Sequence, residues 1–136
     1  MSVGGGCDCQ GGQAVILSCS GAADVGEVSD RAARLLARER AGNMSCLAGI
    51  GARLEGMIAG AREAAPLLMI DGCPTACGRR ALEAASITGF VHLQLKEIGL
   101  MKGSTPRNEE TIQAVAVRAR ELLGITGSSG AGCCSK

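Results

Sequence analysis

The stretch Leu67–Cys77 constrains the fold of this 136-residue chain more than any other. Its first four residues are apolar without alternation, as in a parallel strand that is buried on both faces. Asp71 and Gly72 then end the strand, and Cys73-Pro74 predicts the start of a helix, because proline is favoured in the first helical turn. This order places Cys73 at the carboxyl edge of a sheet, where the amides and the dipole of the following helix lower the pKa of a thiol. We expect the rest of the chain to be arranged around this edge.

Other strands and helices alternate along the chain. Apolar runs predict strands at 14–18 and 90–95, and residues 42–47 form either a short strand or a loop. Helical spacing of apolar residues predicts helices at 26–40, about 51–65, 75–85 and from 108 onward. Asn108 is a suitable N-cap for the last of these helices. The alternation predicts a small Rossmann-like α/β domain of three layers, with a mainly parallel sheet of three to four strands and helices on both faces.

The two ends of the chain differ from the middle. Residues 14–125 are long enough for a single domain with its own core. Residues 1–13 and 126–136 are rich in Gly and Ser and are interpreted as flexible tails. The tails carry Cys7, Cys9, Cys133 and Cys134. Thiols on such tails can pass a soft metal ion on by ligand exchange, can act as a resolving pair in redox chemistry, or can be incidental.

Composition argues against several classes of partner. The formal net charge is only +1, and the chain has one Phe, no Trp and no Tyr. It therefore lacks the basic surface and the stacking rings that nucleic-acid binding uses. No apolar run is long enough to span a membrane, and the start of the chain does not resemble a signal peptide. We expect a cytoplasmic protein, in which the eight cysteines are mostly thiols available for metal binding or redox chemistry.

Four cysteines are predicted to meet at the carboxyl edge of the sheet. Cys19 follows the first strand, and Cys46 precedes the second helix. Cys73 follows the central strand, and Cys77 lies one helical turn further on. Four thiolates suit a zinc ion or, as an alternative, an iron–sulfur cluster. The competing interpretation is that these cysteines are small buried hydrophobic residues.

Three separate motifs carry a resemblance to a known family. Cys19–Arg34, Met44–Gly51 and Ile70–Cys77 are similar, in this order, to the bacterial DGC-domain family, which is named for its Asp-Gly-Cys motif. The resemblance extends over about 14–103. Members are described as zinc-binding because of their cysteines. The resemblance therefore implies a metal set of Cys19, Cys46, Cys73 and Cys77, but it does not supply a reaction.

Two further side chains are candidates for a supporting role. Asp71 either orients a metal ligand from the second coordination shell or caps the helix after Gly72. His92, the single histidine, either supports the metal in the same way or is a hydrogen-bonded residue of the core. Lys102 lies in a glycine-containing loop and either faces the same edge or is a solvated lysine.

The sequence leaves several functions open. The leading hypothesis is a zinc-binding protein for metal storage, transfer or sensing, with a protein partner that exchanges metal or sulfur. The alternative is a thiol-redox or sulfur-transfer enzyme, in which Cys73 attacks and Cys77 or Cys19 resolves. A third hypothesis is an adaptor whose helices bind a protein. These alternatives include both enzymes and binding proteins.

Overall fold

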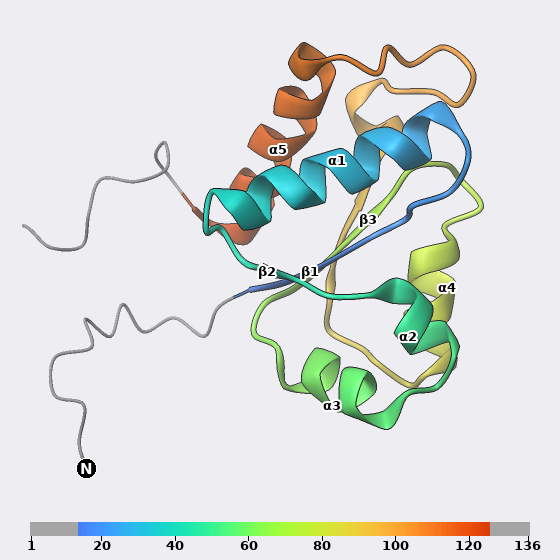
Figure 1. Ribbon diagram of the computed structural model, residues 1–136, viewed down its shortest axis with the longest axis vertical. Coiled ribbons are helices and arrows are strands. Elements are labelled where there is room, and N and C mark those ends of the chain that lie inside the picture. The colour runs from blue at the N-terminus through green and yellow to red at the C-terminus, as the bar shows by residue number, and fades with distance from the viewer. Residues whose placement is uncertain (1–13, 126–136) are drawn as a thin grey trace, which may run out of the picture.

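The computed structural model describes residues 14–125, which form an α/β domain around one parallel sheet (Figure 1). The strands are β1 (Val15–Ser18), β2 (Asn43–Met44), β3 (Leu67–Asp71) and β4 (Val91–Gln94). Their order in the sheet is β2-β1-β3-β4, and every pairing is parallel. The predicted α/β fold with a parallel sheet is therefore confirmed. The tails, with their four cysteines, lie outside the described residues.

Helices cover both faces of the sheet. On one face, α1 (Asp24–Arg38) packs against α5 (Glu109–Leu123). On the other lie α2 (Leu47–Gly51), α3 (Glu55–Glu63) and α4 (Cys77–Ala84), as Figure 1 shows. A short 3₁₀ helix, η1 (Leu95–Ile98), follows β4. No helix within 14–125 is long and apolar enough to cross a membrane.

The central strand supplies the core of both layers. Leu68 and Ile70 are fully buried among side chains of α1 and α5, whereas Met69 is buried among side chains of α2, α3 and α4. Successive side chains of a strand point to opposite faces, so a strand covered on both faces has no polar position. This explains why Leu67–Ile70 reads as an uninterrupted apolar run.

The strand order determines where a ligand site is expected. From β1 the chain crosses through α1 to β2 on one side, and it later returns to β3 on the other side of β1. The direction of winding therefore reverses between β1 and β3. In open parallel sheets, ligands bind in the crevice outside the carboxyl ends of the strands at such a reversal.

Two helices differ from their predicted bounds. The helix predicted at about 51–65 begins only at Glu55, as α3, because Arg53 adopts a left-handed conformation (φ 62°) and Leu54 is the N-cap; the short helix α2, which was not predicted, precedes it. The helix predicted at 75–85 begins only at Cys77, because Ala76 is left-handed (φ 50°). The start of α5 is as predicted, with the Asn108 side chain accepting a hydrogen bond from the Thr111 amide at 2.9 Å.

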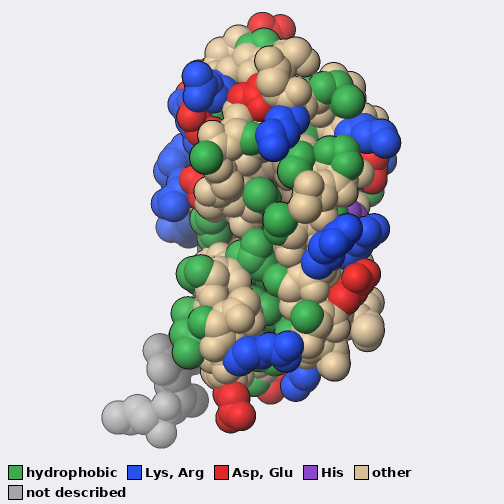
Figure 2. Space-filling view, turned by 90° about the vertical axis from the view of Figure 1, so that its right-hand side faces the viewer, with side chains coloured by type: hydrophobic (Ala, Val, Ile, Leu, Met, Phe, Trp, Pro, Cys, Tyr) green, Lys and Arg blue, Asp and Glu red, His purple; other side chains and the backbone are tan. Residues whose placement is uncertain are grey.

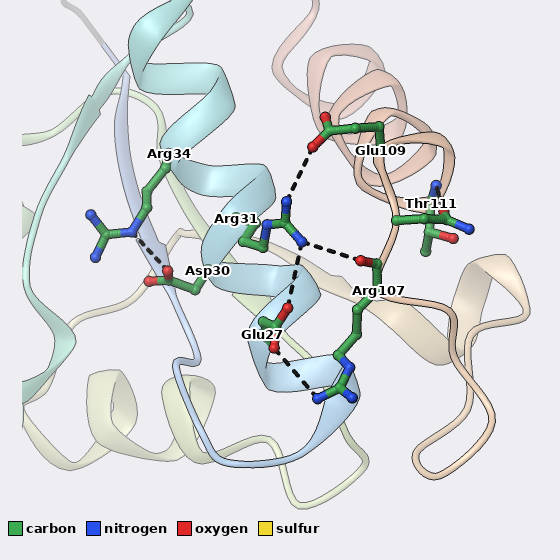
Figure 3. Close-up of polar contacts among 8 residues, drawn as sticks. Glu27, Asp30, Arg31, Arg34, Arg107, Glu109 and Thr111 are labelled. Atoms are coloured by element: carbon green, nitrogen blue, oxygen red, sulfur yellow. Dashed lines mark hydrogen bonds and ion pairs between the residues drawn. The ribbon is translucent and has the colours of Figure 1, made fainter.

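A group of ion pairs joins the beginning of α5 to α1 (Figure 3). The Arg31 guanidinium lies 3.1 Å from the Glu109 carboxylate and 3.5 Å from that of Glu27. It also donates a hydrogen bond to the backbone carbonyl of Arg107. These groups are partly exposed, so each pair stabilises the fold only slightly. Their main effect is to orient the loop before α5 against α1.

Candidate thiol site at the carboxyl edge

All four cysteines of the described domain follow the ends of strands. Cys19 follows β1, Cys46 is the N-cap of α2 just after β2, and Cys73 follows β3. Cys77 is the first residue of α4. Each is a free thiol; Cys19 and Cys73 are half-buried, and Cys46 and Cys77 are exposed. The structure therefore places the predicted cysteines at the carboxyl edge of the sheet.

Three of these cysteines line one cleft of about 890 Å³. We call it the thiol cleft, and it is lined by Ser18, Cys19, Ser20, Asp30, Arg34, Met44, Cys46, Leu47, Cys77 and neighbouring small residues. It lies between α1, the end of β2, α2 and α4, close to the reversal between β1 and β3. Figure 2 shows the carboxyl edge of the sheet, where side chains of the hydrophobic class, which includes cysteine, form a band with Lys and Arg on both sides.

Cys73 does not line the thiol cleft. Its side chain packs against the core formed by α1, α5 and the sheet, and its carbonyl accepts hydrogen bonds from the Gln94 side chain and the Ala76 amide, both at 3.0 Å. The prediction that Cys77 lies one helical turn from Cys73 on the same side was wrong. Residues 73–76 form a turn, and α4 begins only at Cys77. Helical spacing therefore does not relate the two thiols.

The surroundings of Cys73 favour the ionised form of its side chain, the thiolate. Hydrogen bonds from the Thr75 hydroxyl and then the Thr75 amide lower the pKa of Cys73, with smaller contributions from the charge of Lys102 and the Ala76 amide; burial opposes them. The predicted lowering of the Cys73 pKa is confirmed, but its main cause is the hydrogen bonds from Thr75 rather than the amides and dipole of a helix. The donors belong to the turn before α4, and Lys102 does face this edge.

The remaining residues of the Asp-Gly-Cys motif are fixed by packing and hydrogen bonds. The fully buried Asp71 carboxylate accepts hydrogen bonds from the Gly78 and Arg79 amides at 2.8 and 2.9 Å, which caps the beginning of α4. It also lies 2.8 Å from His92 Nε2. Because both carboxylate oxygens act as acceptors, His92 donates to Asp71 from Nε2. The cap interpretation of Asp71 is confirmed. His92 is hydrogen-bonded as predicted, but its side chain is 19% exposed and does not belong to the core. Support of a metal by either residue stays a prediction.

Gly72 lies where no side chain can be placed. A Cβ atom on Gly72 would be 2.7 Å from the backbone carbonyl carbon and oxygen of Val25 in α1. The beginning of α1 therefore packs directly on the turn that carries Cys73. The glycine of the motif allows this close approach of two backbones.

Asp24 anchors the loop that carries Lys102. Its carboxylate accepts hydrogen bonds from the amides of Gly103 and Thr105, at 3.0 and 2.9 Å. These amides lower the pKa of Asp24. A carboxyl group whose pKa is lowered by folding stabilises the folded state above its unfolded pKa, and this contribution is lost as the pH falls through its folded pKa.

Replacing Asp24 by asparagine is expected to release this loop. An amide group accepts more weakly than a carboxylate, so backbone amide hydrogen exchange at Gly103 and Thr105 should become faster by about tenfold at neutral pH. Wild-type protein should show the same acceleration only in acid, as Asp24 is protonated. Exchange at Thr111, whose amide is bound by Asn108, is the internal control. Unchanged exchange at Gly103 would contradict the anchoring role of Asp24.

The four cysteines within residues 14–125 are not gathered into a metal centre. Among residues 14–125, no three His, Cys, Asp or Glu side chains lie close enough together to hold an ion as they stand. The donor type fits a thiophilic cation, but the thiols would have to turn toward one another to bind it. Sequence reasoning missed Ser18 of the cleft and Thr75 beside Cys73, because neither serine nor threonine carries a metal-ligand or nucleophile pattern by spacing alone.

The fold and the cysteine-lined edge define a small α/β protein of the thiol-bearing, Rossmann-like class. The chain belongs to the DGC-domain family, whose family model, described as the DGC domain, matches residues 15–119. A relative from Pseudomonas aeruginosa, the anaerobic and virulence modulator AnvM, is 35% identical over 88 residues, which cover 65% of this chain and 67% of AnvM. No solved structure matches the chain.

Proposed function

We propose that this protein is a cytoplasmic regulator that binds a thiophilic metal ion, with zinc first and an iron–sulfur cluster as the alternative, at the thiol cleft. The observation that carries this proposal is that thiols from three separate loops, those of Cys19, Cys46 and Cys77, line one cleft. Thiolates are the ligands that zinc and iron–sulfur clusters share. A regulatory role rests on the likeness to AnvM, whose name describes a modulator.

An ion bound between these loops would act as a link between α1, α2 and α4. Cys46 and Cys77 begin α2 and α4, and Cys19 follows β1 beside α1. Metal binding would draw these three segments together, and release would let them separate. Such a change at an exposed edge is what a protein partner could recognise. Because each ligand must lose a proton, metal affinity should fall as the pH falls.

Zinc is expected to protect the cleft thiols from alkylation. The experiment uses the full chain with Cys7, Cys9, Cys133 and Cys134 replaced by serine, so that the tails cannot bind the metal. With one equivalent of zinc, N-ethylmaleimide should modify Cys19, Cys46 and Cys77 at least about tenfold more slowly than without it, because a metal-bound thiolate is a weaker nucleophile. Site-resolved mass spectrometry measures the rates. Equal rates at all three thiols would contradict metal binding at this cleft.

A second candidate function is favoured by the surroundings of Cys73. A thiolate held by the Thr75 hydroxyl and two turn amides beside Lys102 suits nucleophilic attack. In that case Cys73 would attack one sulfur of a substrate disulfide, form a mixed disulfide and release one substrate thiolate. Cys77 or Cys19 would then attack the Cys73 sulfur, release the second thiolate and leave an intramolecular disulfide, so that the substrate is reduced and the protein oxidised.

The pH dependence of Cys73 alkylation tests this candidate. Because the pKa of Cys73 is lowered, its alkylation rate should reach half of its plateau at a pH below the ordinary cysteine value of about 8.5. Replacing Thr75 by valine removes the hydroxyl donor and should move this midpoint upward. A wild-type midpoint at or above the ordinary value, unchanged in Thr75→Val, would exclude Cys73 as an activated nucleophile.

A further inference from the structure

Arg34 brings an oriented positive charge to the wall of the thiol cleft. It lies on α1, one turn after Asp30, and both residues line the cleft. The Arg34 Nε atom donates to one oxygen of the Asp30 carboxylate at 2.7 Å, and the Ser20 hydroxyl donates to the other oxygen at 2.9 Å (Figure 3 shows the Arg34 pair). Within residues 14–125, the two Nη atoms of Arg34 have no partner. Asp30 therefore holds one side of the guanidinium and leaves its outer edge open.

The open edge of the Arg34 guanidinium suits a second carboxylate. Its two Nη atoms present parallel N–H groups that match the two oxygens of a carboxylate, and such charge-assisted pairs are stronger than neutral hydrogen bonds. The bond to Asp30 keeps the guanidinium oriented, so less side-chain freedom is lost when a ligand binds. An arginine on an open surface would simply be hydrated. Arg34 differs because it lies on the wall of a cleft.

The rest of the cleft suits the apolar part of an organic molecule. Its volume of about 890 Å³ lies within the range of small-molecule pockets, about 300–1,000 Å³. Met44 and Leu47 supply large apolar side chains, and Ala48 and Ala81 supply small ones. The cleft also lies near the reversal of winding between β1 and β3, where open parallel sheets bind their ligands. One oriented cationic group with apolar walls favours an organic anion over an inorganic one.

We propose that the thiol cleft binds a small organic carboxylate. The two Nη atoms of Arg34 hold its carboxylate group, and Met44 and Leu47 contact its apolar part. Because Cys46 and Cys77 line the same cleft, the bound molecule lies in a space that these thiols share. This inference goes beyond the proposed function and does not rest on a bound metal ion, since neither Arg34 nor the apolar walls are metal ligands.

Hexanoate and hexanamide are the probes for the test, because they have the same apolar chain and differ in the charged group. The full chain is kept reduced with dithiothreitol, which carries no carboxylate, and amide proton–nitrogen NMR spectra follow each titration. Hexanoate should shift the amide signals of Cys46 and Leu47 saturably, with a dissociation constant on the order of 1 mM. Hexanamide should bind at least about tenfold more weakly. The Thr111 amide, in α5, is the internal control and should not shift.

Two arginine variants separate the guanidinium of the cleft from the general charge of α1. Arg34→Gln should weaken hexanoate binding by about tenfold, because the carboxylate loses its paired donors. Arg38→Gln removes an exposed charge one turn further along α1, outside the cleft lining, and should weaken binding by less than about twofold. Circular dichroism checks that both variants are folded.

Three outcomes would overturn this inference: no shift at Cys46 and Leu47, equal affinity for hexanoate and hexanamide, or equal loss of affinity in the two arginine variants. If Arg34→Gln fails to fold, Arg34→Lys replaces it. Lysine keeps the charge but lacks the paired donors, so binding should weaken by at least about threefold, and an unchanged affinity would overturn the inference. Zinc protection of the thiols is measured without a carboxylate, so the proposed function and this inference can fail separately.

Discussion

Replacing Gly72 by alanine is expected to destabilise the domain by about 3 kcal/mol. The new Cβ atom would lie 2.7 Å from the carbonyl carbon and oxygen of Val25, which is inside van der Waals contact. Both neighbours are backbone atoms at the beginning of α1, so no side chain can rotate to make room. The clash can be relieved only by moving α1 or the Cys73 turn. Urea unfolding followed by circular dichroism at 222 nm measures the change in the free energy of unfolding.

Gly56→Ala provides the matched control. Gly56 lies in α3, and a Cβ atom there would have no atom within 4 Å apart from its chain neighbours and the backbone of its own helix. Since alanine is the better helix former, this substitution should stabilise the domain by about 0.5–1 kcal/mol. The two substitutions add the same methyl group with opposite signs of effect. A Gly72→Ala protein as stable as wild type would contradict the close packing of α1 on the Asp-Gly-Cys turn.

Replacing Asp71 by alanine is expected to lower the free energy of unfolding by about 3 kcal/mol. The substitution removes the cap from the Gly78 and Arg79 amides and the acceptor from His92, at a position where the Asp71 side chain itself is fully buried. Each group left without a partner carries a desolvation penalty. Urea unfolding measures the total, and faster amide exchange at Gly78 and Arg79 shows that the start of α4 has loosened.

Two other variants separate the contributions to the Asp71 effect. Asn108→Ala removes a single side-chain cap, that of α5, and should cost only about 1 kcal/mol. His92→Ala removes one partner of Asp71 but leaves the cap of α4 in place, so it should be milder than Asp71→Ala. If Asp71→Ala cost no more than Asn108→Ala, the shared role of this carboxylate as cap and histidine acceptor would be wrong.

Each residue of the Asp-Gly-Cys motif has a different structural role. Asp71 fixes the beginning of α4 and the orientation of His92, and Gly72 admits α1. Cys73 receives the hydrogen bonds of the turn that follows. Two of the three residues are therefore explained by folding alone. The motif fixes the turn between β3 and α4 at the carboxyl edge of the sheet, and Cys19 and Cys46 reach the same edge from other loops.

The central elements of the fold could be predicted from local signals. The buried run Leu67–Ile70 and the cap at Asn108 are each specified by a few neighbouring residues, and both are found where predicted. The break between α2 and α3 could not be predicted in this way. It depends on a left-handed Arg53, a conformation that arginine does not favour locally and that the packing of Ile50 and Ile58 on the sheet stabilises.

The candidate site was predictable in its location but not in its arrangement. Cysteines that follow parallel strands must lie at one edge, and the structure places all four there. The relation between Cys73 and Cys77 depends on a single left-handed residue, Ala76, which delays the start of α4. Counting four residues as one helical turn therefore placed Cys73 and Cys77 together, although only Cys77 lines the thiol cleft and Cys73 packs against the core. Ser18 could not be singled out from the sequence, because its burial and its unpaired hydroxyl depend on how the whole domain packs.

The metal content of the protein tests the central claim most directly. The variant with serine at Cys7, Cys9, Cys133 and Cys134 would be purified without oxygen or chelators and measured by elemental analysis together with Cys46→Ser in the same background. The chain has no Trp or Tyr, so the near-ultraviolet spectrum would also show any metal–thiolate bands clearly. We expect about one zinc ion per chain, lost in Cys46→Ser. Metal-free protein in which all four remaining thiols titrate freely, before and after added zinc, would contradict a metal site at the thiol cleft.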